Sequence, residues 1–391
     1  METRKKMAEK RLFRKWNVKG KTMLPVHVGA GQENTVDPLE YVVKDGMFYR
    51  VDIEGMLKSD QDFAEKFVKA SESRDQILSL KKCIHDSFNP SIREQWVHRA
   101  HVSKSFNDMY KKKLFDLNNQ LLVHCLPFSG TAYIPGSSIK GAIRTAVLDE
   151  LAREKGYKNV NAKLNNEAEI RRLKGNKLAN MAESIVCLGT GNMKPDNDPF
   201  RFIKVTDAKL PPDSTEIVMV RNTVTEGRKA GPMGIDMFVE VVKENVDFEF
   251  QISIASKEYM QDKNEVLSKF RNISWIIAAT FNYLIDEPGN LIKESEKYYD
   301  GKNVRASNAI DRIIDDYNSQ MNRENITYLR VGRFSHLECM TFSDRPASPM
   351  DTGMHLCRMN ETTHKKGYGK TRNLIDGTVP LGVIRCEINK G

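Results

Sequence analysis

One short segment of this chain combines the residue types that hold phosphate groups. Residues 133–146 read Tyr-Ile-Pro-Gly-Ser-Ser-Ile-Lys-Gly-Ala-Ile-Arg-Thr-Ala, a Pro-Gly turn that leads into two serines and a run with helical spacing. Lys140 and Arg144 follow the serines, one turn apart. The first amides of a helix are free donors that carry a partial positive charge. Hydroxyl, ammonium and guanidinium groups beside them make such a helix start suitable for phosphate.

The overall charge indicates which kind of phosphate is expected. The chain has 391 residues, with 61 Lys and Arg against 52 Asp and Glu, a formal net charge of +9. The excess gathers at the ends, with nine basic and two acidic residues in 1–21 and seven basic and three acidic residues in 358–391. This balance predicts an anionic partner, here a nucleic-acid backbone. Two solvated basic ends are the alternative.

The helix start supplies the first set of candidate contacts. The expected phosphate ligands are Gly136, Ser137, Ser138, Lys140 and Arg144, with both cations on a helix face that lies clear of the core. A capped surface helix with two solvated cations is the alternative interpretation.

Two glycine-containing segments supply further candidates. In Pro25-Val-His-Val-Gly-Ala-Gly31, the glycines would let a sugar-phosphate chain lie against the main chain, with His27 beside them, although many strands simply end on glycine. A second basic loop interleaves an aromatic residue with cations, which suits phosphate contact and base stacking. Its candidate contacts are Lys365, Lys366, Gly367, Gly369, Lys370 and Arg372. A nucleotide-binding P-loop is rejected there, because His364 stands where that pattern needs glycine.

Composition and spacing exclude several other classes of protein. A hydrophobic content of 40% with 29% charged residues is typical of a folded chain. The six cysteines form no C-x-x-C pair, so we expect no zinc site, no cofactor and free thiols in a reducing cytoplasm. No apolar run reaches the ~18 residues of a membrane span, and the start lacks the apolar region of an export signal.

Periodicity predicts an α+β fold. Strict alternation over 246–254 predicts a strand, and the spacing over 138–155 predicts a helix with one apolar face. Further strands are expected over 11–28, 201–205, 217–220, 326–331 and 383–388, with helices over 264–285 and 306–317. Residues 222–236, which include Arg228 and Lys229, read as a long basic hairpin between strands. We expect an N-terminal half over 1–215 with a helical insertion at about 52–124, and a second half over 216–391.

Together these segments resemble the RAMP superfamily, the repeat-associated proteins of CRISPR effector complexes. The resemblance is carried by 25–31, by 133–146, by Asp198-Pro-Phe-Arg-Phe-Ile-Lys-Val-Thr-Asp207 and by 367–372 with 381–385, in that order. It implies ferredoxin-like, RRM-related halves packed together. It also implies that the hairpin at 222–236 is a thumb that presses on a guide RNA and displaces a base. The RNP1 aromatic pattern of an ordinary RNA-recognition motif is absent from the sequence.

Within the superfamily, the chain is most similar to the Csm-complex subunit that caps the crRNA 3′ end in type III-A effectors. Residues 37–46 and the long separation of Gly31 from Gly136 carry this similarity. It implies an RNA-binding subunit without catalysis that ends the filament and influences crRNA maturation in antiviral defence. The implied partners are crRNA, target RNA in the assembled complex, the neighbouring backbone and small subunits, and host nucleases that trim the guide.

Catalysis and pure assembly remain as alternatives. Asp37, with Glu33 nearby, lies roughly where backbone RAMP subunits carry a metal-assisted aspartate, although Asp-Pro is also a common start of a turn. Metal-free RNA processing by His27 or His124 ranks lower, because nothing in the sequence pairs either histidine with an activating group. A protein-only assembly factor, whose basic ends contact acidic partners, is the third hypothesis.

Overall fold

The computed structural model describes most of the chain. The described residues are 13–29, 34–116, 121–155, 176–189, 193–224, 231–232, 234–256, 265–285, 291–335 and 371–391. They combine helices and strands in an α+β fold, as predicted.

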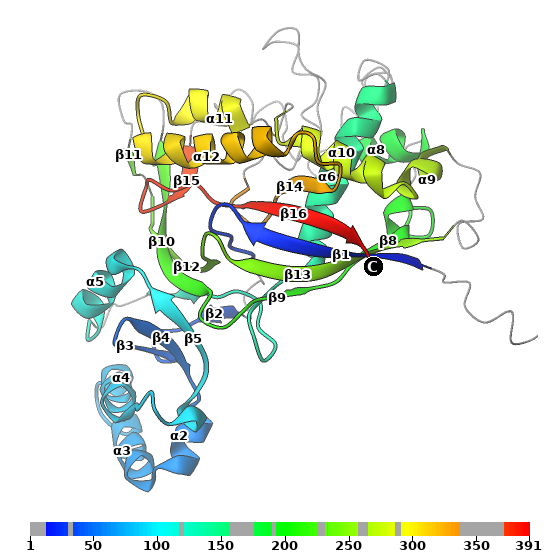
Figure 1. Ribbon diagram of the computed structural model, residues 1–391. Coiled ribbons are helices and arrows are strands. Elements are labelled where there is room, and N and C mark those ends of the chain that lie inside the picture. The colour runs from blue at the N-terminus through cyan, green and yellow to red at the C-terminus, as the bar shows by residue number, and fades with distance from the viewer. Residues whose placement is uncertain are drawn as a thin grey trace, which may run out of the picture.

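The centre of the molecule is a five-stranded antiparallel sheet that contains the first and last strands of the chain (Figure 1). The strand order is β14 (Ile326–Arg330), β16 (Val383–Lys390), β1 (Phe13–Thr22), β13 (Asp247–Ala255) and β8 (Ile203–Val205). With α6 (Gly136–Lys155) after β1 and α10 (Ile273–Tyr283) after β13, the order along the chain is β1-α6-β8-β13-α10-β16. This is a ferredoxin-like unit with β14 added at its edge.

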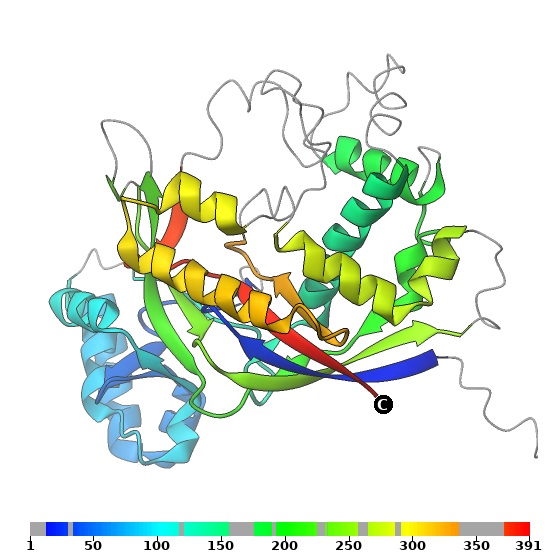
Figure 2. The ribbon, with the colours of Figure 1, turned by 45° about the horizontal axis from the view of Figure 1, so that its top comes forward.

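One face of this sheet packs against the helices. Val18 of β1 lies opposite Phe250 and Ile388 in the neighbouring strands, and all three belong to the main hydrophobic core. Ile143 and Ile276 bring α6 and α10 into the same core. Figure 2 shows both helices on the same side of the sheet. The alternation predicted for 246–254 and the apolar face predicted for 138–155 are therefore both confirmed.

A second, mixed sheet is built from the segments inserted between these elements. Its order is β2 (Thr35–Val36), β6 (Val123–His124), β12 (Met237–Val242), β10 (Thr215–Val224), β5 (Trp96–Val102), β4 (Met47–Val51) and β3 (Tyr41–Lys44), with β11 (Gly231–Pro232) and β15 (Thr371–Ile375) also paired to β10. The pairs β10–β5 and β12–β6 are parallel. A small two-stranded sheet joins β7 (Tyr133–Ile134) to β9 (Ala208–Lys209).

The predicted insertion at about 52–124 contains helices and also the strands β5 and β6. The helices are α2 (Ile53–Ser59), α3 (Gln61–Ser71), α4 (Gln76–Ser87), the short 3₁₀ helix η2 (Arg93–Gln95) and α5 (Lys104–Lys113). Asp52 and Asp60 cap α2 and α3 by accepting backbone amides. Strand β5 was not predicted; it pairs with β4 and β10 and so ties the insertion to the second sheet (Figure 1).

Two sequence predictions need correction. The helix expected over 264–285 is two helices, α9 (Glu265–Phe270) and α10, because Asn272 caps the second by accepting the Ser274 amide at 3.1 Å. The strand pairing does not follow the predicted division at residue 215, because β1 of the first half lies between β13 and β16 of the second half.

The remaining elements are α8 (Asn176–Leu188), η4 (Pro199–Phe202), α11 (Leu291–Tyr298) and α12 (Val304–Gln320). Within the described ranges, no helix is both long and apolar enough to span a membrane.

Candidate nucleic-acid interface

The start of α6 is already occupied by an anion from the protein. The Gly136 amide donates to the Asp207 carboxylate at 2.8 Å, so one of the free donors expected for phosphate is used internally. Gly136 is buried, and a Cβ atom there would lie 2.2 Å from the Val205 carbonyl oxygen. This glycine therefore lets the helix start approach the chain after β8, and we correct its expected role as a phosphate contact.

Arg144 is also engaged inside the protein. Its guanidinium donates to the Glu183 carboxylate at 2.6 and 3.0 Å and to the Asp198 carboxylate at 2.9 and 3.2 Å. It lies 4.4 Å from the centre of the Phe200 ring. Burial alone would lower the pKa of Arg144, but the two carboxylates outweigh that effect and raise it. The expectation that this cation lies clear of the core is wrong, because carboxylates distant in the sequence surround it.

The outward-facing part of this segment is smaller than predicted. Ser137 is exposed, while Ser138 and Lys140 are partly exposed. Burial lowers the pKa of Lys140, although Asp198 acts in the opposite direction. Among the described residues no carboxylate lies within ion-pair distance of the Lys140 ammonium. These three residues stay predicted phosphate contacts.

The loop after β1 forms a compact site with a segment from the far end of the chain. The Arg333 amide donates to the His27 carbonyl at 2.9 Å, and a Cβ atom on Gly332 would lie 2.2 Å from that same oxygen. Gly332 has a φ of 98°, a conformation that favours glycine. Gly29 is exposed, and so is the Arg333 side chain. This arrangement places the exposed Arg333 side chain beside the bare main chain of Gly29.

His27 is the buried floor of this site. Its side chain is 1% exposed, its Nδ1 lies 2.7 Å from the Glu240 carbonyl oxygen, and its ring packs 5.5 Å from the Phe334 ring. Burial lowers the pKa of His27 to about 4, and nearby Arg333 acts in the same direction. The ring is therefore neutral near pH 7, with its proton on Nδ1, because a carbonyl can only accept.

The residue that bonds to the His27 ring, Glu240, has a buried carboxylate with contacts of its own. Glu240 is fully buried in β12; its Oε1 lies 2.7 Å from Nε2 of His98, and its Oε2 accepts the Leu126 amide at 3.0 Å. Burial would raise the pKa of the Glu240 carboxyl, but hydrogen bonds from His98, Thr215 and Leu126 outweigh it and lower the pKa. This network links the insertion strand β5 to the strand beneath the loop.

Arg372 occupies a different position from the one predicted. Its side chain is 4% exposed, with the guanidinium carbon 3.4 Å from the centre of the Tyr298 ring. The Glu294 carboxylate lies 3.7 Å from Arg372 Nε and 3.1 Å from the guanidinium of Arg330. Tyr299 donates to the same carboxylate at 2.8 Å. We therefore correct the expectation that Arg372 contacts RNA, because it joins β15 to α11 in a buried ionic cluster.

The predicted thumb has the stem of a hairpin. Strands β10 and β12 pair antiparallel, with Val220 opposite Met237, and Arg221 forms an ion pair with Asp236 at 3.0 Å across the stem. Ile235 is 91% exposed beside this stem. The remaining predicted contacts lie outside the described residues: Gly31, Arg228, Lys229, Lys365, Lys366, Gly367, Gly369 and Lys370.

Asp37, the alternative catalytic residue, forms a turn. Its Oδ1 accepts the Leu39 amide at 3.0 Å, and its own amide donates to Glu40 at 2.9 Å. This arrangement accounts for an aspartate before proline. The His124 ring bonds Thr35 at 3.1 Å. Across the described ranges, no cluster of three or more His, Cys, Asp or Glu residues has the arrangement of a metal site.

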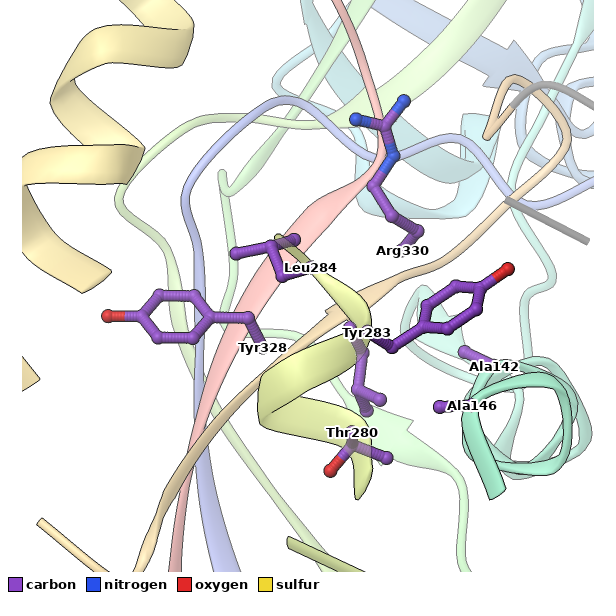
Figure 3. Close-up of a pocket in the computed structure, with 8 residues that line it drawn as sticks. Ala142, Ala146, Thr280, Tyr283, Leu284, Tyr328 and Arg330 are labelled. Atoms are coloured by element: carbon purple, nitrogen blue, oxygen red, sulfur yellow. The ribbon is translucent and has the colours of Figure 1, made fainter. Parts of the chain in front are cut away.

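The cavities near the core do not contain the predicted contacts. Figure 3 shows the residues around one cavity; its volume is about 10 Å³, at the lower limit for holding a single water molecule. Ala142 and Ala146 of α6 line it together with Thr280 and Tyr283 of α10 and with Leu284, the residue that follows α10. A larger cavity of about 330 Å³ lies where the ends of α6 and α8 meet α9, beside the ion pair of Glu154 and Lys269. We therefore place the candidate interface on the surface.

The predicted contacts thus fall into separate groups. His27 and Gly29 lie together with Arg333, which the sequence reasoning missed; its signal was a Gly-Arg pair directly after a strand. Gly136 and Arg144 each contact the segment 198–207, so two sequence motifs meet in space, but through internal ion pairs and hydrogen bonds.

Comparison with known proteins decides the family. The family model described as "RAMP superfamily" matches residues 126–345, more than half of the chain. The chain belongs to the RAMP superfamily. This confirms the resemblance inferred from the sequence motifs.

Two curated relatives are similar to part of this chain. It is 32% identical over 141 residues to "CRISPR system Cms protein Csm5" of Methanocaldococcus jannaschii, covering 34% of this chain and 30% of that protein. It is 22% identical over 249 residues to the protein of the same name from Streptococcus thermophilus, covering 61% of this chain and 63% of that protein. The matches thus span less than two thirds of the length of these relatives.

Solved structures share the RAMP fold of this chain. One chain in the cryo-EM structure of a Csm–crRNA–target RNA ternary complex from a type III-A CRISPR-Cas system superposes with a TM-score of 0.61 at 17% identity, covering 95% of this chain and 100% of that chain. The crystal structure of T. onnurineus Csm5 gives a TM-score of 0.55 at 16% identity, covering 94% and 99%. At these identities the similarity shows the fold.

Proposed function

We propose that this RAMP protein is an RNA-binding subunit of a type III-A Csm complex that grips the 3′ region of the crRNA without cleaving it. The observation that carries the proposal is the exposed Gly29 main chain, which lies beside the exposed Arg333 side chain and above the buried His27 ring. Bare main chain and a cation contact sugar and phosphate, and therefore bind largely without sequence preference. The Csm5 relatives and the type III-A structure support the choice of complex.

Target RNA in the assembled complex and the neighbouring backbone and small subunits are the further partners of this proposal. The insertion of α2, α3 and α4 extends to one side of the two sheets (Figure 1). Extra material at one end of a filament blocks the heterologous contact that would add the next subunit. We expect the chain to end the filament in this way and to influence where trimming nucleases stop.

Salt-dependent RNA binding tests the grip. We expect the affinity for a labelled single-stranded RNA to fall steeply with salt concentration, by about 0.7 in the log–log slope for each phosphate contacted. Lys140→Ala should make the slope shallower. Lys58→Ala removes the same charge from an exposed lysine paired with Glu54 in the insertion, and should leave the slope unchanged.

Reconstitution of the complex tests the capping role. Complexes assembled with and without this chain should differ in filament length and in the length of crRNA protected. Equal lengths would contradict capping. Normal incorporation of the chain into complexes that lack crRNA would favour the assembly-factor alternative. Cleavage of RNA by the pure protein with Mg²⁺, lost in Asp37→Ala, would replace the proposal with the nuclease alternative.

A further inference from the structure

The floor of the Gly29 site carries an unused acceptor. Nε2 of His27 is buried and has no hydrogen-bond partner in the structure. Nδ1 carries the proton that is donated to Glu240, so Nε2 of the neutral ring holds a bare lone pair. A buried polar atom without a partner costs free energy and calls for an explanation.

On the side of Gly29, few protein atoms cover Nε2 of His27. A Cβ atom built on Gly29 would lie 3.9 Å from Nε2 of His27 and 3.6 Å from Cδ of Arg333. The missing side chain of Gly29 and the aliphatic part of Arg333 therefore face the same small space. Arg333 is exposed, and no described carboxylate forms an ion pair with it, so its charge is not neutralised by a described residue.

The chemistry of the space defines its ligand. It combines a guanidinium donor at the surface, bare main chain and one acceptor that lacks a donor, and this combination suits a hydroxyl close to a phosphate. Ribose in RNA offers a 2′-hydroxyl donor beside its phosphate, and deoxyribose does not.

We propose that His27 and Arg333 form a subsite for one ribonucleotide, in which Nε2 of His27 accepts the 2′-hydroxyl and Arg333 holds the adjacent phosphate. This inference rests on the proposed RNA-binding function and specifies it, because the subsite selects RNA over DNA. Gly29 keeps the approach to Nε2 open.

Gly29→Ala is the sharpest test, because the fold accommodates the new methyl group. Its distances to His27 and Arg333 would both be ordinary van der Waals contacts, and Gly29 is not in the left-handed region. The methyl would nevertheless fill the approach to Nε2. Gly141→Ala is the matched control, since a Cβ atom at this exposed helical glycine meets nothing within 4 Å.

Affinities of the full chain are measured for a labelled single-stranded RNA and for the DNA of the same sequence, followed by RNAs with single 2′-deoxy positions. Wild type should bind the RNA roughly three- to tenfold more tightly than the DNA, the value of one hydrogen bond. Gly29→Ala should remove most of this preference by weakening RNA binding, and Gly141→Ala should retain it. Arg333→Gln should weaken binding of both strands.

The outcomes separate the two levels of the proposal. Equal affinity of wild type for RNA and DNA, or an unchanged preference in Gly29→Ala, overturns the ribose subsite and leaves the RNA-binding function standing. Failure of wild type to bind either strand, together with failure to join a crRNA-containing complex, overturns the proposed function itself.

Discussion

Replacing His27 with glutamine should flatten the dependence of stability on pH. Burial lowers the pKa of His27 to about 4 from the 6.5 of a free imidazole. Between these values the unfolded chain binds a proton that the folded chain does not, so folding stability rises with pH across this window. Stability is accordingly lost as the pH falls from 6.5 toward 4.

The magnitude follows from linkage. With these two pKa values, protonation of the unfolded chain costs about 2 kcal/mol of stability at pH 5 and nearly nothing at pH 7. The side chain is 1% exposed, so solvent screening does not reduce this figure appreciably. Glutamine keeps a donor for the Glu240 carbonyl and has no proton to bind in this range.

Urea unfolding followed by tryptophan fluorescence at pH 5 and pH 7 gives the comparison. The difference between the two pH values should be smaller by about 2 kcal/mol in His27→Gln than in wild type. His124, whose pKa is also lowered by burial, is present in both proteins, so its contribution to the pH dependence of stability cancels in the comparison. His85→Gln, which removes a partly exposed imidazole from the insertion, controls for the loss of a histidine elsewhere. An unchanged difference in His27→Gln would refute the reasoning.

Three further substitutions test the internal contacts. Arg144→Ala should lower the free energy of unfolding by about 2 kcal/mol, allowing for its partial exposure, yet leave the RNA affinity of the folded protein unchanged; a loss of affinity without a loss of stability would contradict this. Gly136→Ala should cost about 3 kcal/mol or more, because its Cβ overlaps the Val205 carbonyl, and thermal unfolding near the wild-type temperature would speak against that clash. Glu240→Gln should cost about 1–3 kcal/mol in urea unfolding, since one amide group cannot accept from both His98 and Leu126 as the carboxylate does.

The spacing of apolar residues predicted those helices and strands that bury one face and expose the other. The alternation in β13 and the apolar face of α6 follow from periods of two and 3.6 residues, which the sequence displays directly. Strand β5 was missed because it sits between helices in a charge-dense segment. Its identity depends on partners β4 and β10, of which β10 lies more than a hundred residues away.

The candidate site was predicted only in part for the same reason. The glycines and basic residues of the predicted phosphate contacts are visible in the sequence. The carboxylates that bond to Gly136 and Arg144 are not adjacent to them in the sequence. Glu183 lies 39 residues from Arg144, and Asp207 lies 71 residues from Gly136. Arg333 was overlooked because its partner, the loop at Gly29, is at the other end of the chain.

These contacts imply that the segment 133–146 belongs only in part to the RNA surface. Arg144 and Arg372 are cations with close carboxylate and aromatic partners, and both are fixed by contacts within the protein, Arg372 fully buried and Arg144 partly exposed. Arg333 and Lys140 have no described carboxylate partner and remain at or near the surface. A cation that already has its counter-charge gains little from a phosphate, because it would have to exchange one anion for another. The capacity to bind RNA should therefore reside in the cations that the fold leaves unpaired, and Arg144→Ala compared with Arg333→Gln separates the two roles in a single pair of measurements.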